Sequence, residues 1–258
     1  MSLNPWLQDA LALALTVVAI QALVLVNGLL QKKELLPTYI TRKIIHIFAA
    51  PIFVLCWMLY SGAPASRFFA AIVPLAFIIQ FAAIGFGWRE DEAFVKSMSR
   101  SGDPRELLGG TMHYAVVMLV VALLFFTNGD SASFTPSAMI ILGALAGGDG
   151  LADIVGRRYG GRSFGVGGST KTLAGSLAMF VGSLLMSWLL LVIFGLRAGV
   201  APGVFLLPTL LLSLLATIVE AISPKGLDNY LIPLAVFIGI LLLVWLTPGL
   251  WPYPVFAW

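Results

Sequence analysis

Eight long apolar runs constrain this chain more than any other feature of its sequence. Each run has about the 20 apolar residues that a helix needs to cross roughly 30 Å of hydrocarbon. They lie near residues 7–30, 44–60, 67–87, 111–127, 136–155, 173–196, 203–222 and 231–247. The sequence therefore predicts an all-α fold, a polytopic integral membrane helical bundle of about eight transmembrane helices, whose surroundings are the lipid bilayer.

The composition leaves too little polar sequence to coat a water-soluble globule. Of the 258 residues, 60% are hydrophobic and only 10% are charged, whereas soluble domains carry about 25% charged residues. The net charge of +3 comes from basic residues in short loops, which is typical of membrane topology and does not indicate nucleic acid as a partner. The single cysteine, Cys56, excludes an internal disulfide. We expect residues 1–258 to form a single transmembrane helical domain.

The loops between the apolar runs differ in their content of Lys and Arg. The loops near 31–43, 88–110 and 156–171 are rich in basic residues, whereas the loops between them hold one or none. The last two loops, including the one near 223–230, hold one each. Because basic loops stay on the cytoplasmic side, we expect these four loops to be cytoplasmic and both termini to lie outside.

Two aspartates inside the fifth apolar run are the most informative polar residues. Asp149 and Asp153 lie about 20 and 25 Å from the outer end of a helix that starts at Pro136, and their i, i+4 spacing puts both carboxylates on one face. An ionised residue in mid-membrane costs about 2.5–3.5 kcal/mol, and such residues are usually functional. The pair suits Mg²⁺ with phosphate oxygens completing its shell. The alternative is a structural pair of salt bridges to Arg157 and Arg158.

Glycines surround this aspartate pair. Gly147, Gly148 and Gly150 either break the helix or let a ligand approach the backbone, whereas Gly143 and Gly147 equally fit a small-residue packing face. The following stretch, 156–171, combines many glycines with four cations. Backbone N–H groups, Arg and Lys together make an anion cradle, and a basic loop without function is the alternative.

Further polar candidates lie near the same membrane face. They are Arg42, Lys43, His46, His113, Glu220, Asp228 and Asn229. Arg42 and His46 share a helix face, and the positive-inside rule explains Arg42 but not His46. Glu220 lies about 26 Å along its helix, inside an apolar run. Helix capping is an alternative explanation for Asp228 and Asn229, and His113 is the weakest candidate.

Several motifs in the sequence resemble those of a known family, the CTP-dependent polyprenol kinases, which comprise dolichol, phytol and farnesol kinases. Arg42-Lys43-x-x-His46 resembles their Arg-Lys-x-x-His signature, and the stretch 148–160 resembles their CTP-binding motif. The stretch 171–176 resembles the lysine-and-glycine end of that motif, and residues 220–233 resemble the family's last conserved block. The short chain is more like the phytol kinases than the larger dolichol kinases.

The resemblance implies transfer of the γ-phosphate of CTP to a membrane-dissolved isoprenoid alcohol, with Mg²⁺ as cofactor. Our hypothesis for this reaction assigns Asp149 and Asp153 to the metal and to catalysis, and His46 or Glu220 to removal of the alcohol proton. The residues that it implies for CTP and its phosphates are Arg42, Lys43, Gly156, Arg157, Arg158, Gly160, Lys171, Thr172, Asp228 and Asn229.

Other functions fit parts of the same pattern. A phosphatidate cytidylyltransferase-like CDP-lipid synthase would share the Mg²⁺–CTP site and the lipid substrate but would join CMP to the lipid. A diacylglycerol kinase using CTP would differ in its acceptor alone. A transporter would place polar groups near mid-membrane in both halves of the fold, and the N-terminal half has few. The apolar runs do not predict which lipid is the acceptor, nor the oligomeric state of the protein.

Overall fold

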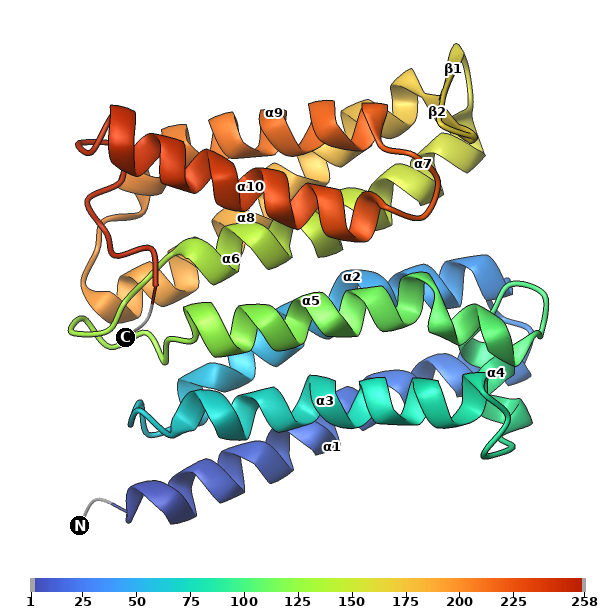
Figure 1. Cartoon of the computed structure of the whole chain (residues 1–258), viewed down its shortest axis with the longest axis horizontal. Helices are drawn as coiled ribbons and strands as arrows, with labels where there is room; N and C mark the ends of the chain where they lie inside the picture. The colour runs from blue at the N-terminus through green and yellow to red at the C-terminus, as the bar shows by residue number, and fades with distance from the viewer. Residues whose placement is uncertain (1–2, 257–258) are drawn as a thin grey trace.

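The structure is a computed structural model that describes residues 3–256, and it consists almost entirely of helices (Figure 1). In chain order the elements are α1 (Pro5–Lys32), α2 (Thr38–Cys56), η1 (Trp57–Leu59), α3 (Ser66–Gly85), α4 (Glu92–Met98), η2 (Pro104–Leu108), α5 (Gly110–Phe125), α6 (Ser137–Gly143), η3 (Ala144–Asp149), α7 (Gly150–Tyr159), β1 (Ser163–Val166), β2 (Ser169–Thr172), α8 (Leu173–Ala198), η4 (Pro202–Phe205), α9 (Leu206–Ile222) and α10 (Asp228–Leu246).

Eight helical spans in the described chain are long and apolar enough to cross a membrane, which confirms the predicted polytopic helical bundle. The fifth span, Ser137–Tyr159, joins α6, η3 and α7 into one continuous helix. In this span 72% of the apolar stretch is buried, against 28–44% in the other seven. The helix that carries Asp149 and Asp153 is therefore the central helix of the bundle.

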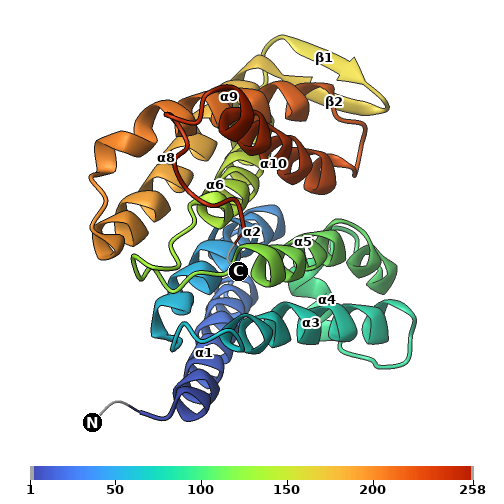
Figure 2. The same ribbon diagram turned by 60° about the vertical axis from the view of Figure 1, so that its left-hand side comes forward.

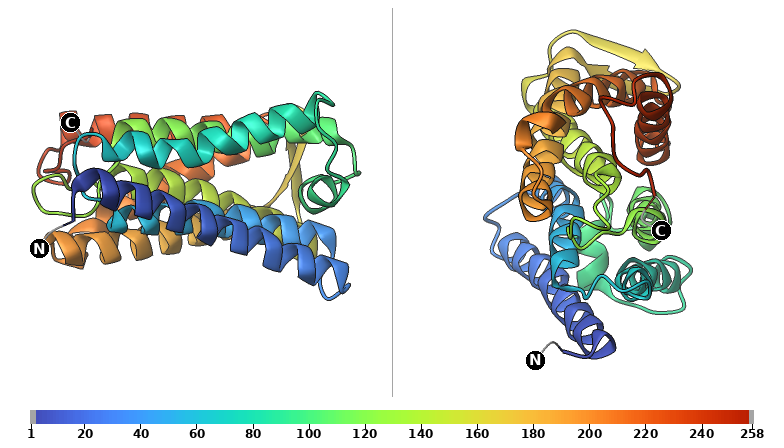
Figure 3. Two further views of the ribbon diagram at one scale, coloured as in Figure 1. Left: turned by 90° about the horizontal axis from the view of Figure 1, so that it is seen from below. Right: turned by 90° about the vertical axis from the view of Figure 1, so that its left-hand side faces the viewer.

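The remaining spans form two groups beside the central helix (Figure 1). The first group consists of α1, α2, α3 and α5, and the second of α8, α9 and α10. Contacts of α2 with α7 join the first group to the central helix, and contacts of α5 with α10 join the two groups directly. Both ends of the described chain lie at one end of the bundle, and the β-hairpin lies at the other (Figures 1 and 3).

Glycines let the central helix pack closely against α8. A Cβ atom added at Gly147 would lie 2.5 Å from the backbone oxygen of Gly182, and one added at Gly143 would lie 2.6 Å from Cα of Ser187. The packing-face interpretation of these glycines is thus confirmed. The helix does not break at this point, but η3 widens into six residues of π-helix that end at Asp149.

The stretch 156–171 is more ordered than the predicted loop. Helix α7 continues to Tyr159, and strands β1 and β2 then pair antiparallel, with Val166 opposite Ser169 (Figure 2). The two turn residues, Gly167 and Gly168, have φ angles of +53° and +78°. A two-residue hairpin turn of type I′ needs positive φ at both positions, which glycine adopts without strain. The sequence prediction missed this hairpin because four-residue strands without apolar alternation give no periodic signal.

Residues 88–110 cover the first group of helices at the same end as the hairpin (Figure 3). Asp91 caps α4 by accepting a hydrogen bond from the Phe94 backbone N–H at 3.0 Å. Val95 and Met98 are buried, and the rings of Phe94 and Phe81 lie 5.9 Å apart. The short helix α4 is therefore packed onto the bundle through its apolar face.

Candidate active site

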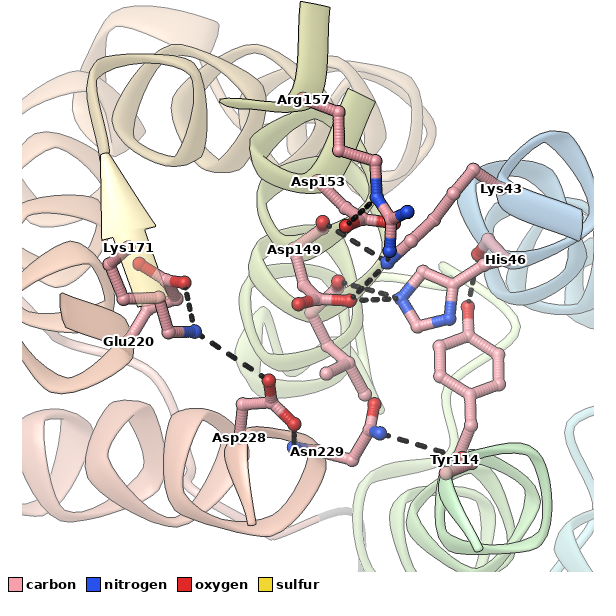
Figure 4. Close-up of polar contacts among 12 residues, drawn as sticks. Lys43, His46, Tyr114, Asp149, Asp153, Arg157, Lys171, Glu220, Asp228 and Asn229 are labelled. Atoms are coloured by element: carbon pink, nitrogen blue, oxygen red, sulfur yellow. Dashed lines mark hydrogen bonds and ion pairs between the residues drawn. The ribbon is translucent and has the colours of Figure 1, made fainter. Parts of the chain in front are cut away.

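The aspartates of the central helix face the polar residues of α2. Lys43 Nζ lies 3.0 Å from Asp149 Oδ2 and 3.7 Å from Asp153 Oδ2. His46 Nε2 lies 3.1 Å from the same oxygen of Asp149, and Arg157 Nε donates to Asp153 Oδ1 at 2.7 Å. Two sequence motifs about a hundred residues apart thus form one cluster (Figure 4). Of the predicted structural salt bridges, the structure shows the one between Asp153 and Arg157.

The imidazole of His46 is held in a fixed orientation. Its Nε2 lies 3.3 Å from the backbone oxygen of Leu145, in addition to the Asp149 carboxylate. Because both neighbours are acceptors, we assign the hydrogen to Nε2. Tyr114 packs its ring 4.3 Å from the His46 ring and donates to the His46 backbone oxygen at 2.7 Å. With that tautomer, His46 orients Asp149, and its cavity-facing nitrogen has no free lone pair for a proton.

A second cluster faces the first from the C-terminal group of helices (Figure 4). Lys171, on β2, donates a hydrogen bond to Glu220 near the end of α9 and lies 3.7 Å from Asp228 Oδ2 at the start of α10. The Glu220 side chain is only 5% exposed and that of Lys171 is 14% exposed. Burial lowers the pKa of the Lys171 ammonium, but the hydrogen bond and charge of Glu220 outweigh burial and raise it above its ordinary value.

One cavity of about 940 Å³ lies between the two clusters. Most of the site residues that the sequence predicted line it: Arg42, Lys43, His46, Asp149, Asp153, Gly156, Arg157, Lys171, Thr172, Glu220, Asp228 and Asn229. Its volume is at the upper end of the roughly 300–1,000 Å³ that is usual for ligand pockets. The cavity therefore has room for more than one small substrate.

Three of the candidate residues lie away from this cavity. Arg158 is exposed and places its guanidinium 5.8 Å from the ring of Tyr159, and Gly160 follows the end of α7. Neither residue lines the cavity, so their phosphate-binding roles stay predictions without support from its geometry. His113 packs against Tyr230, with ring centroids 4.6 Å apart, and is also absent from the cavity wall.

Two buried polar atoms on the cavity wall have no hydrogen-bond partner among the described residues. They are Ser176 Oγ, in the first turn of α8, and Asn229 Oδ1, in the first turn of α10. An unsatisfied buried polar atom costs about 1–3 kcal/mol, and a bound polar ligand would remove that cost. Ser176 and Tyr114 were not among the predicted site residues. Ser176 could have been found from the sequence, because it ends the motif-like stretch 171–176 that begins with Lys171 and Thr172. No sequence pattern marks Tyr114 as a site residue.

Glycine also shapes the wall where α7 meets the start of α8. Thr172 caps α8 by accepting a hydrogen bond from the Gly175 backbone N–H at 3.0 Å. A Cβ atom at Gly156 would lie 3.1 Å from Thr172 Oγ1. The two glycines therefore bring the backbone of the hairpin end close to the aspartate helix, and they place the N-terminus of α8 beside the cavity. Helix N-termini favour anions.

The carboxylates fit a metal ion that arrives with its own ligands. Within residues 3–256 no three His, Cys, Asp or Glu side chains form a ready-made metal site. Mg²⁺ usually binds proteins through one or two carboxylates together with substrate phosphates and water. Asp149 and Asp153, one helical turn apart on the cavity wall, provide such a pair.

The fold and site together define a class of protein: a polytopic helical membrane protein with a charged cavity near one end of the bundle. Comparison with known proteins narrows this class. Neither a protein-family profile nor a solved structure matches the chain.

Curated relatives match most of the chain. A probable chloroplastic phytol kinase 1 of Oryza sativa subsp. japonica is 36% identical over 92% of this chain and 74% of its own length. The chloroplastic phytol kinase 1 of Arabidopsis thaliana is 31% identical over 92% of this chain and 77% of its own length. The chloroplastic farnesol kinase of Arabidopsis thaliana is 34% identical over 71% of this chain and 58% of its own length. The chain belongs to the family of phytol and farnesol kinases, as the sequence motifs indicated.

Proposed function

We propose that this protein transfers the γ-phosphate of CTP to the hydroxyl of a membrane-dissolved prenol such as phytol, farnesol or a longer polyprenol. The observation that carries the proposal is the cavity in which the Lys43–Asp149 and Lys171–Glu220 clusters face each other. The kinase names of the relatives support phosphoryl transfer to a prenol. CTP as the donor rests on the resemblance of residues 148–160 to the CTP-binding motif.

The cations on the cavity wall support the proposed binding of the phosphates. Arg42, Lys43, Arg157 and Lys171 all line the cavity, and the N-terminus of α8 adds backbone donors beside Ser176. Phosphoryl transfer depends on positioning and on neutralising charge more than on covalent chemistry. These groups would hold the triphosphate in line with the acceptor hydroxyl.

Mg²⁺ is the proposed cofactor, held by Asp149 and Asp153. The basic and acidic side chains on the cavity wall nearly balance, so the protein alone has little surplus positive charge for a triphosphate. When bound, Mg²⁺ supplies that charge and lowers the charge repulsion at the transferring phosphoryl group. Removal of divalent cations with a chelator should therefore abolish nucleotide binding as well as turnover.

Glu220 is the better placed of the two predicted proton acceptors, because His46 Nε2 already donates to oxygen. A phosphate bound by Lys171 would draw its ammonium away from Glu220 and leave the carboxylate able to accept a proton. The prenol O–H then gives its proton to Glu220 while its oxygen bonds to the γ-phosphorus. The bond from that phosphorus to the β–γ bridging oxygen breaks, so CDP and a prenyl phosphate leave.

The active-site end of the bundle is proposed to face the cytoplasm, with both chain termini outside. The basic loops gather at this end, together with the hairpin and α4 (Figure 3). A prenol keeps its hydroxyl at the headgroup boundary, where it would meet the cavity, and a nucleotide reaches the same end from water.

Label transfer in detergent or liposomes tests the proposed reaction. CTP labelled at the γ-phosphate or in the cytidine is offered with phytol, farnesol, dolichol, diacylglycerol or phosphatidate, with the Asp149→Asn variant as control. γ-Label in a prenol, with release of CDP, would establish the kinase and name its acceptor. Cytidine label in phosphatidate would instead establish a CDP-lipid synthase. Folded protein that transfers neither label would overturn the proposal.

A further inference from the structure

The cavity that holds the charged clusters also has an apolar arm. This arm extends between α1, α2, α3 and α5 and is lined by Ile20, Val24, Ala49, Val73, Phe77 and Met118. No charged residue of α1 or α3 lines the cavity, within the described chain. Charged and apolar walls thus meet in one continuous space, with Lys43 and His46 at the boundary between them.

The arm is closed at its inner end. One helical turn further toward the outer end of each helix lies a side chain that is 0% exposed and does not line the cavity: Thr16 on α1, Phe53 on α2, Ala70 on α3 and Ala122 on α5. The four residues come from all four helices around the arm. All four are fully buried at about the same depth in the bundle, and we call this set of residues the floor.

The length of the arm follows from helix geometry. Along α3, the lining residues extend from Phe81 to Val73, which is about 12 Å at 1.5 Å per residue. Along α2, the distance from Lys43 to Ala49 is about 9 Å. The arm is therefore about 9–12 Å deep, and the nucleotide would occupy the rest of the cavity.

We propose that the apolar arm is the binding pocket for the acceptor's hydrocarbon tail, and that Ala49 and Val73, directly above the floor, limit the length of the tail. This inference rests on the proposed kinase function. Phe77 and Phe81 give the arm an apolar wall, and the flexible thioether side chain of Met118 can adapt to a methyl-branched tail.

The test is a change of chain-length preference. Ala49→Leu extends a side chain into the bottom of the arm, whereas Ala10→Leu places the same change on an exposed part of α1 away from the cavity. The measurement is kcat/KM for phytol divided by that for farnesol, together with KM for CTP. Ala49→Leu should lower this ratio by about tenfold or more, since one methylene in an apolar pocket is worth about 10–200-fold. KM for CTP and the ratio in Ala10→Leu should be unchanged.

A ratio that stays constant in folded Ala49→Leu enzyme would overturn the inference. A second measurement does not depend on catalysis or on the folding of a variant. A phytol analogue with a photoreactive group at its tail end should label wild-type protein at the floor residues Thr16 or Ala70, or at Ala49 directly above them. Labelling at the exposed Phe48 or Leu75 instead would also overturn it. Floor labelling without phosphorylation of any prenol would refute the kinase function and leave the tail pocket standing.

Discussion

Lys43 links two motifs, one on α2 and one on the central helix, that the sequence analysis could only identify separately. Its ammonium contacts both Asp149 and Asp153, so a single α2 side chain neutralises part of the charge of two partly buried carboxylates. The positive-inside rule accounts for a lysine at this position but not for where its ammonium lies. The ion pairs at the site therefore assign Lys43 to the cavity wall, beside the proposed metal-binding carboxylates.

Replacing Asp149 by Asn should lower phosphoryl transfer by about 100-fold or more, on the scale of removing one electrostatic contact to a developing charge. Asn keeps the shape of the side chain, and Lys43 retains Asp153 as a partner, so the fold should survive. Turnover and thermal unfolding in detergent measure both effects. Asp130→Asn is the matched control, because Asp130 lies at the opposite end of the bundle with its side chain 57% exposed. Full activity in Asp149→Asn would remove Asp149 from the mechanism.

The raised pKa of Lys171 gives a pH prediction. A lysine whose pKa is higher in the folded than in the unfolded protein stabilises the fold fully below about 10.4, the unfolded value. That stabilisation is lost as the pH rises through the folded value. The melting temperature of the wild-type protein should therefore fall as the pH rises through this alkaline range. The melting temperature of Lys171→Met should fall less over the same range, because the variant has no ammonium to lose its proton. Lys225→Met, at an exposed position, is the control and should behave like the wild type.

Site residues could be predicted at the positions where a charged residue interrupts an apolar run near the hairpin end of the bundle. Asp149, Asp153 and Glu220 are of this kind, and all three line the cavity. Tyr114 gives no such signal, because an aromatic residue in a membrane helix is ordinary. The sequence placed Arg158 beside Arg157 in the site, but adjacent residues point in different directions on a helix, and only Arg157 lines the cavity.

At the scale of elements, apolar length predicted all eight spans, because the bilayer demands a nearly fixed number of apolar residues. The hairpin was not predictable in the same way. Its turn depends on the positive φ of Gly167 and Gly168, and its position depends on a hydrogen bond from the Lys225 backbone N–H to the Gly167 oxygen at 3.3 Å. Such long-range pairing leaves no periodic pattern in the sequence.

The contact between the central helix and α8 gives a stability prediction. Gly147→Ala would push a methyl group against the Gly182 backbone and Met186 Cβ, each 2.5 Å away. Overpacking of this kind costs about 1–3 kcal/mol, and thermal unfolding in detergent should show the loss. Gly28→Ala is the matched control, because a Cβ there would meet nothing within 4 Å. It should leave stability unchanged or slightly raised, and an equal loss in both variants would argue against the close packing.

At the scale of the whole molecule, the β-hairpin, whose Lys171 lines the charged cavity, lies at one end of the bundle, and both ends of the described chain lie at the other (Figure 3). Single cysteines in a Cys56→Ser background can test the orientation. Ser163→Cys in the hairpin should react with an impermeant thiol reagent only from the cytoplasmic side, and Ser131→Cys between α5 and α6 only from the outside. Both positions are exposed. The reverse pattern would place the active site on the outer face, and labelling of both from one side would refute the span count.

The π-helical stretch at Ala144–Asp149 acts as a one-residue insertion in an otherwise α-helical rod. Everything after it is rotated by about 100° relative to an uninterrupted helix, which is the angle between successive residues. That rotation is what turns the Asp149 and Asp153 carboxylates toward Lys43. A relative lacking one residue here would keep both aspartates in its sequence and yet point them away from the cavity. A sequence alignment that scored only residue identities would classify such a relative as an active enzyme, because both aspartates would still align.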